Sequence, residues 1–105
     1  MKELDKKYVF HIPLYKFEDD ELIKLEIDDD LDDLMALLKS DSLYITKVRS
    51  FYKSRCFDEL LVSLFVSGSE KPEEIFKEWF RTNNDILGQE SFSYECGDRM
   101  FIFDL

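Results

Sequence analysis

The sequence predicts a single α+β domain over residues 1–105, with an antiparallel sheet and two helices on one face. Three observations lead to this fold class. Several short segments alternate apolar and polar residues as strands do, and two longer segments carry apolar residues at helical spacing. The chain has only three glycines and two prolines, so its connections must be short. Aromatic residues make up 15% of the chain, which indicates a packed core.

The N-terminal part of the chain predicts a β-hairpin. Residues 7–17 have the alternation of a strand, and Pro13 indicates a bulge or a sheet edge because proline has no N–H for the ladder. A polar turn follows at residues 18–21. Residues 22–27 then predict a second strand, with Ile23, Leu25 and Ile27 on its inward face.

A helix and two further strands are predicted next. The helix begins at Asp28, whose carboxylate we expect to cap the free N–H groups of the first turn. Its apolar residues fall at i, i+3, i+4 and i+7, the spacing of one buried stripe. The stripe residues are Leu31, Leu34, Met35 and Leu38. Strands are predicted at residues 43–53 and 60–67, joined by a turn over residues 54–58.

The C-terminal part predicts a second helix and a second hairpin. Pro72 suits the first turn of a helix and Gly88 suits its end. Its expected buried residues are Ile75, Phe76, Trp79, Phe80, Asn83 and Leu87. The dipeptide Gly97-Asp98 predicts a two-residue turn between strands at residues 92–96 and 99–103. The expected cross-strand pairs are Cys96 with Arg99, Tyr94 with Phe101 and Phe92 with Phe103.

The order of these elements predicts the topology. The order is ββαββαββ, and from the second strand onward it contains βαββαβ, the ferredoxin-like arrangement. We therefore predict a ferredoxin-like core that is extended by the first and last strands. The two helices are expected to cover the same face of the antiparallel sheet.

One segment, from Glu18 to Asp33, carries almost all of the net charge, and we call it the acidic segment. It holds ten acidic residues and one lysine, so its net charge is −9 against −10 for the whole chain. One interpretation is a recognition surface for a basic partner, and the other is a helix cap with a solvated turn. Capping needs only one or two of the acids. The candidate partner-binding residues are Glu18, Asp19, Asp20, Glu21, Glu26, Asp28, Asp29, Asp30, Asp32 and Asp33.

The charge pattern leads to a functional prediction. We predict a non-enzymatic acidic inhibitor that occupies a basic, nucleic-acid-binding surface of a partner protein, such as a nuclease component. Anti-CRISPR, anti-restriction and nuclease-immunity proteins are analogous in kind, although no motif places this chain in one of those families. The net charge of −10 argues against direct binding to nucleic acid or to an anionic membrane.

Two alternatives stay open. One is a small enzyme or ligand-binding domain whose pocket the sequence does not reveal, and the other is a structural or assembly subunit of a viral or plasmid system. No GxGxxG, P-loop, GxSxG or HExxH motif is present, so we predict no catalytic residues and no cofactor. His11 is the only histidine, and Cys56 has no identifiable base. A conserved pocket lined by His11 or Cys56 would favour the enzyme.

The acidic residues that begin the predicted helix partly match the pattern of a calcium-binding loop. Asp28, Asp30 and Asp32 have the first spacing of such a loop. However, Asp33 stands where the loop needs glycine, and Lys39 stands where it needs a bidentate glutamate. We therefore predict no metal site.

The chain has one basic cluster, which we call the basic stripe. It consists of Lys47, Arg49, Lys53 and Arg55, with Phe51 among them. Single-stranded nucleic acid is one ligand for such a stripe, but the net charge favours an exposed face whose bases pair with neighbouring acids. A further hypothesis is a homodimer in which the acidic segment of one copy meets the basic stripe of the other.

The sequence also predicts the compartment. The N-terminus lacks the apolar core of a signal peptide, and no run approaches the ~20 apolar residues of a membrane span. Cys56 and Cys96 form no CxxC pair, and we expect both thiols to be reduced and buried. We therefore expect a cytoplasmic protein without membrane contact, located in the host cytoplasm if it is viral.

Overall fold

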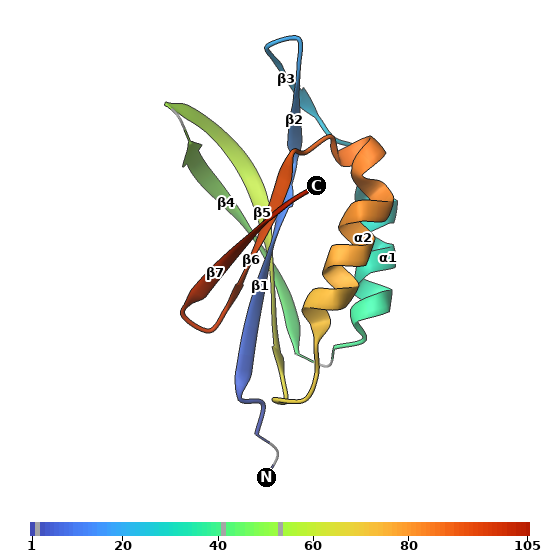
Figure 1. Cartoon of the computed structure of the whole chain (residues 1–105), viewed down its shortest axis with the longest axis vertical. Helices are drawn as coiled ribbons and strands as arrows, with labels where there is room; N and C mark the ends of the chain where they lie inside the picture. Colours follow the sequence, from blue (N-terminus) through green and yellow to red (C-terminus); the bar gives the residue numbers. More distant parts are fainter. Residues whose placement is uncertain (2, 41, 53) are drawn as a thin grey trace.

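The computed structural model describes residues 1, 3–40, 42–52 and 54–105. It has a five-stranded antiparallel sheet in the order β4-β5-β1-β6-β7, with helices α1 and α2 on one face (Figure 1). The strands of this sheet are β1 (Lys6–Pro13), β4 (Leu43–Tyr52), β5 (Arg55–Val66), β6 (Ser91–Cys96) and β7 (Arg99–Asp104). The helices are α1 (Asp28–Leu38) and α2 (Pro72–Leu87). The predicted α+β class and the two helices on one face are confirmed.

The βαββαβ core is present, but its first strand is β1. β1 and β4 are both antiparallel to β5, which lies between them, as in a split βαβ unit. β6 pairs with the other edge of β1, and β7 extends the sheet beyond β6. The pairs that were predicted for this last hairpin are confirmed, including Tyr94 with Phe101 and Phe92 with Phe103.

The predicted N-terminal hairpin lies outside the main sheet. The first predicted strand is interrupted at Leu14, so that β1 ends at Pro13 and β2 (Tyr15–Glu18) begins a separate two-stranded sheet with β3 (Glu21–Lys24). Proline cannot donate to a ladder, and its ring disfavours continuation of a regular strand. Of the three residues predicted to face the core, Leu25 and Ile27 are buried, whereas the prediction for Ile23 is wrong, because its side chain is 36% exposed on this projecting hairpin.

β5 begins earlier than its sequence indicates. The predicted turn over residues 54–58 is wrong, since Tyr52 already pairs with Arg55 and the strand runs from there to Val66. Ser54 has a positive φ of 64°, which allows a tight reversal. Residues 55–59 read Arg-Cys-Phe-Asp-Glu, which lacks the alternation of a strand, and their pairing with β4 makes them part of β5.

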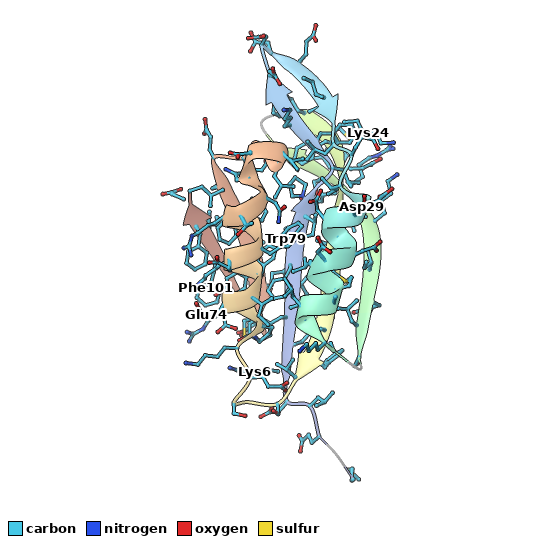
Figure 2. All side chains as sticks on the ribbon, turned by 90° about the vertical axis from the view of Figure 1, so that its right-hand side faces the viewer. Lys6, Lys24, Asp29, Glu74, Trp79 and Phe101 are labelled. Atoms are coloured by element: carbon cyan, nitrogen blue, oxygen red, sulfur yellow. The ribbon has the colours of Figure 1, made fainter. Side chains whose placement is uncertain are left out.

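Aromatic side chains dominate the core between the sheet and the helices. Phe10 of β1 stacks on Phe76 of α2 with ring centroids 4.4 Å apart, and Phe80 stacks on Phe92 at 4.7 Å. Trp79 lies at the seam between the two helices, where its Nε1 donates to the Asp30 carbonyl oxygen at 2.8 Å (Figure 2). The predicted stripe of α1 is confirmed, with Leu31, Leu34 and Leu38 buried and Met35 packed against them.

The helix ends agree with the prediction at one terminus and differ at another. α2 starts at Pro72 and ends at Gly88, whose φ of 61° is the left-handed C-cap conformation. In α1, Asp28 is the first helical residue, whereas the N-cap is Ile27 without a side-chain cap bond. The predicted Asp28 cap is therefore wrong. The acids of the first turn still lie at the positive end of the helix dipole.

Candidate functional site

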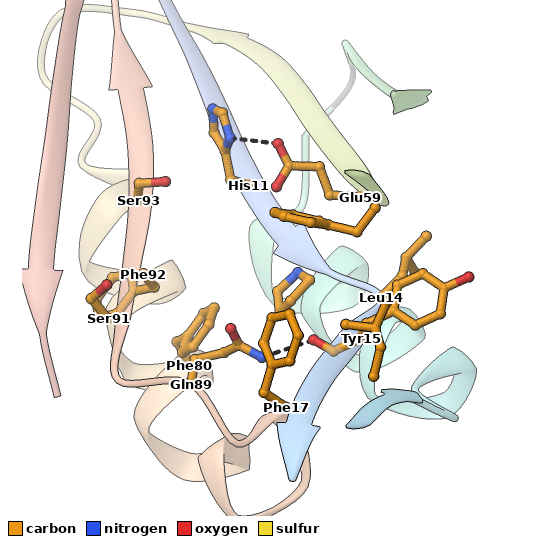
Figure 3. Close-up of a pocket in the computed structure, with 13 residues that line it drawn as sticks. His11, Leu14, Tyr15, Phe17, Glu59, Phe80, Gln89, Ser91, Phe92 and Ser93 are labelled. Carbon is orange, nitrogen blue, oxygen red and sulfur yellow. Dashed lines mark hydrogen bonds and ion pairs between the residues drawn. The ribbon is translucent and has the colours of Figure 1, made fainter. Parts of the chain in front are cut away.

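The candidate site lies where the main sheet divides. β1 ends at Pro13, which is paired with Glu59, so residues 55–58 of β5 have β4 as a neighbour but no partner from β1. The β2–β3 hairpin turns away at the same level, and a cavity of about 270 Å³ opens beside it (Figure 3). The residues that line it are His11, Pro13, Leu14, Tyr15, Phe17, Leu22, Phe57, Glu59, Phe80, Gln89, Ser91, Phe92 and Ser93.

A polar cluster stands at one end of this cavity. His11 Nδ1 lies 3.2 Å from Glu59 Oε1, and its Nε2 lies 2.6 Å from Glu95 Oε2 (Figure 3 shows the first of these contacts). Ser50 donates its hydroxyl hydrogen to Glu59 Oε1 at 2.8 Å. Three strands therefore converge on the histidine, because His11, Glu59 and Glu95 come from β1, β5 and β6.

The surroundings shift two pKa values in opposite directions. Burial by itself would lower the pKa of His11, but the contacts with Glu59 and Glu95 outweigh it and raise this pKa above the ordinary value. The hydrogen bond with His11 is the main cause that lowers the pKa of Glu59; burial opposes it, and Ser50 adds to it. Because two carboxylates face one imidazole, the cluster keeps a net negative charge whether His11 is neutral or protonated. The cluster therefore attracts a cationic ligand.

Five of the thirteen residues that line the cavity are phenylalanine or tyrosine. Tyr15 and Phe17 of β2, Phe57 of β5 and the core residues Phe80 and Phe92 contribute rings. Aromatic faces next to carboxylates attract cations, and they also offer stacking surfaces to a planar base. The arrangement can therefore bind a ligand that combines a positive charge with an aromatic ring.

Gln89 holds the hairpin side of the cavity in place. Its Nε2 donates to the Tyr15 carbonyl oxygen at 3.0 Å (Figure 3). The same Nε2 donates to the Leu87 carbonyl oxygen at 2.7 Å. The connection that follows α2 is thereby tied to β2. At the outer rim, Phe17 is 50% exposed and the guanidinium of Arg55 lies 4.6 Å from its ring centroid.

The basic stripe is divided between different partners. Lys47 Nζ lies 3.6 Å from Asp58 Oδ2, and Arg49 Nε lies 3.5 Å from Asp58 Oδ1. This pairing is the one expected for an exposed face that is neutralised by neighbouring acids. Lys53 lies outside the described residues. Cys56 is a free, exposed thiol, so the prediction that it is buried is wrong, while Cys96 is free and half-buried.

The ten acids that were predicted to bind a partner fall on two elements. Four of them, Glu18, Asp19, Asp20 and Glu21, lie at the tip of the β2–β3 hairpin, and Glu26 follows that hairpin. The remaining five begin α1: Asp28, Asp29, Asp30, Asp32 and Asp33. Figure 2 shows Asp29 on α1 and Lys24 on the strand that returns from the tip. None of the ten is among the residues that line the cavity. Their binding to a basic partner, and a homodimer, stay predictions.

Sequence reasoning missed most of the site. Glu59, Glu95, Ser50 and Gln89 are separated by long stretches of chain and meet only through strand pairing. The one available signal was His11, a lone histidine within a strand. A conserved pocket lined by His11 was expected to favour an enzyme, and His11 does line this cavity.

No helix in the described ranges has the length and the apolar composition that a membrane crossing requires. No groups of histidine, cysteine, aspartate or glutamate suited to hold a metal ion occur among those residues.

Comparison with known proteins places the fold. No protein-family model matches the chain. The search of curated proteins also found no match. A solved structure titled as phage SAM lyase in complex with S-methyl-5′-thioadenosine matches with a TM-score of 0.60 and 11% identity, over 100% of this chain and 95% of that chain. The apo state of phage SAM lyase matches with a TM-score of 0.52 and 15% identity, over the same shares.

These matches correct the functional prediction. At such low identity they establish the fold alone, and the fold that the chain shares over its full length is that of an enzyme. The prediction of a non-enzymatic inhibitor that imitates nucleic acid, analogous to anti-CRISPR proteins, is therefore wrong. The alternative of a small enzyme or ligand-binding domain agrees better with the fold and with the cavity beside His11.

Proposed function

We propose that this chain is a small enzyme that binds a sulfonium nucleoside of the S-adenosylmethionine type and releases S-methyl-5′-thioadenosine from it. The observation that carries the proposal is a net negative cluster at the cavity, in which His11 and Glu59 line the cavity and Glu95 contacts His11 Nε2. The fold of phage SAM lyase, matched over the full chain, supports the same ligand class.

The ligand chemistry suits the cavity for a physical reason. A sulfonium carries a fixed positive charge that no change of pH removes, and carboxylates and aromatic faces both stabilise such a charge. Glu59 is held ionised by His11 and Ser50, so it supplies this negative charge without first losing a proton. The cavity of about 270 Å³ is slightly smaller than the usual range for small-molecule sites, about 300–1,000 Å³.

The proposed reaction breaks the bond between the sulfonium sulfur and the carbon chain of the amino acid. The electron pair of that bond passes to sulfur, which leaves as the neutral thioether S-methyl-5′-thioadenosine. A lyase adds no water, so the new bond must come from the amino acid itself. Either its carboxylate oxygen attacks the carbon that sulfur leaves and closes a lactone, or the neighbouring carbon loses a proton to solvent and a carbon–carbon double bond forms. The positive charge on sulfur disappears in this step. The anionic cluster therefore binds the cationic substrate more tightly than the neutral product, which favours product release.

Glu59 is assigned a binding role in this proposal. Its carboxylate recognises the sulfonium charge, and His11 acts as a positioning residue that orients it. We further propose that the protein works in a reducing cytoplasm, since Cys56 is a free, exposed thiol.

The test is incubation of the purified protein with S-adenosylmethionine and quantification of S-methyl-5′-thioadenosine by liquid chromatography and mass spectrometry. A protein-free sample corrects for spontaneous breakdown of the substrate. We expect product above this blank, and at least tenfold less at limiting substrate concentration for Glu59→Gln. Asp98→Asn is the charge-matched control, because Asp98 is exposed in the β6–β7 turn and should leave the rate unchanged.

Three results would count against the proposal. Product formation equal to the blank, together with no calorimetric binding of S-adenosylmethionine, would remove it. Saturable binding without product would instead identify a ligand-binding domain. Equal loss of activity in Glu59→Gln and Asp98→Asn would contradict the assignment of the cavity.

A further inference from the structure

A second, smaller cavity adjoins the first one. It has a volume of about 170 Å³, and three residues, Tyr15, Leu22 and Phe57, line both cavities. The remaining lining residues are Arg49, Cys56 and Asp58. Both cavities arise from the same feature of the fold, the division of the sheet beyond Pro13, where β5 continues without β1 beside it.

The chemistry of the second cavity differs from that of the first. Arg49 and Asp58 face each other on neighbouring strands as a register pair, with Arg49 Nε 3.5 Å from Asp58 Oδ1. A guanidinium has five N–H donors, and the Arg49 side chain is 69% exposed, so it can take a further carboxylate. The Asp58 carboxylate is 26% exposed and can accept further hydrogen bonds.

We propose that this second cavity binds the α-amino acid end of the ligand, with Arg49 holding the α-carboxylate and Asp58 the α-ammonium. This inference rests on the proposed function. An amino acid zwitterion carries one negative and one positive group on the same carbon, and the Arg49–Asp58 pair presents the complementary charges. Asp58 and Glu59 are consecutive in β5, so their side chains point to opposite faces of the sheet. A ligand that contacts both would pass the edge of β5 that β1 leaves free beyond Pro13, beside Tyr15, Leu22 and Phe57.

Arg49 can be distinguished from its neighbour Lys47. Both side chains come from β4 and both approach Asp58, at 3.5 Å and 3.6 Å. Only Arg49 is among the residues that line the second cavity. A guanidinium also binds a carboxylate in a bidentate manner, whereas an ammonium acts as a point charge. Lys47 therefore serves as a matched control.

The experiment uses two neutral thioethers that differ in the amino acid end. S-Adenosylhomocysteine has this end, and S-methyl-5′-thioadenosine lacks it, so their affinities report on the second cavity without the sulfonium charge. Isothermal titration calorimetry of the wild type, Arg49→Met and Lys47→Met gives the dissociation constants. We expect Arg49→Met to weaken S-adenosylhomocysteine binding about tenfold, as the loss of a charge-assisted contact implies. Binding of S-methyl-5′-thioadenosine should change less than twofold in both variants. Lys47→Met should not weaken S-adenosylhomocysteine binding, because Lys47 contacts Asp58 without lining the second cavity.

The outcomes separate the two proposals. Equal affinity of the wild type for both thioethers, or unchanged S-adenosylhomocysteine binding in Arg49→Met, overturns the amino acid subsite and leaves the nucleoside cavity in place. Equal weakening by Arg49→Met and Lys47→Met also overturns it, since a general charge effect would then explain the loss. If the wild type binds neither these thioethers nor S-adenosylmethionine, the proposed function fails and the subsite fails with it.

Discussion

Replacement of Trp79 tests how the two helices are joined. Its side chain is 3% exposed, and its indole lies 6.4 Å from the Phe76 ring and 6.0 Å from the Phe80 ring between centroids. Its Nε1 donates to the Asp30 carbonyl oxygen of α1 at 2.8 Å. The residue thus contributes both packing and a hydrogen bond between the helices.

The two contributions predict different costs for two variants. Trp79→Ala removes the packing contacts and leaves a cavity. We expect the free energy of unfolding to fall by about 3–5 kcal/mol as a result. Trp79→Phe keeps an aromatic ring but removes the donor, so we expect a loss of about 1–2 kcal/mol. Domains have a total stability of roughly 5–15 kcal/mol, so Trp79→Ala should remain folded only with a small margin.

Urea unfolding measures both costs. Trp79 is the only tryptophan, so the transition is followed by far-ultraviolet circular dichroism in place of fluorescence. Arg81→Ala, an exposed position on the same helix, is the control and should change stability by less than about 0.5 kcal/mol. A loss below about 1 kcal/mol for Trp79→Ala would refute the reasoning, because a buried indole at the helix seam could not then be the main contact.

Three further predictions concern pH, backbone conformation and metal binding. Folding raises the pKa of His11 above 6.5, so the stability that this group contributes is complete below pH 6.5 and is lost as the pH rises through the folded-state pKa. Folding lowers the pKa of Glu59 below 4.5, so the stability that this group contributes is complete above pH 4.5 and is lost as the pH falls through the folded-state pKa. The urea midpoints of the wild type and His11→Gln should therefore differ most between about pH 4.5 and 6.5, and a pH-independent difference would contradict the ion cluster. Gly88→Ala should lower stability by about 1 kcal/mol or more in urea unfolding, because φ is 61° and the added Cβ would lie 2.9 Å from Lys16 Cδ; an unchanged midpoint would show that the helix end relaxes freely. Calcium should leave the melting temperature unchanged, because the acidic segment is divided between a hairpin tip and a helix, and a clear rise in calorimetry would show a metal site.

Local patterns were sufficient for much of the fold. The stripe of α1, the limits of α2 at Pro72 and Gly88, and the turn at Gly97-Asp98 depend on neighbouring residues and on the conformational preferences of proline and glycine. These elements were predicted correctly for that reason. The errors occurred where the local pattern did not decide the structure. Residues 55–59 lack the alternation of a strand although they pair with β4, and residues 22–27 have the alternation of a core strand although the hairpin projects from the sheet.

The site could not be predicted in the same way. His11, Glu59 and Glu95 meet because β1 lies between β5 and β6, and this neighbourhood is a property of strand order. The acidic segment was the most visible feature of the sequence, and it drew attention away from a cavity that none of its ten acids lines. Charge density in a segment is a local property, whereas a binding cavity is made by residues that are distant along the chain.

The sequence by itself determined the α+β class, the two helices with their buried stripes, the C-terminal hairpin and the strong negative charge, because each follows from periodicity or composition. Only the tertiary structure decided that the chain leaves the main sheet after Pro13, that β5 continues past that point, and that two cavities form in the gap. The physical reason is that strand pairing is a long-range interaction. Its register brings Glu59 and Glu95 to His11 and Asp58 to Arg49, and no residue type or spacing in the chain specifies those partners in advance.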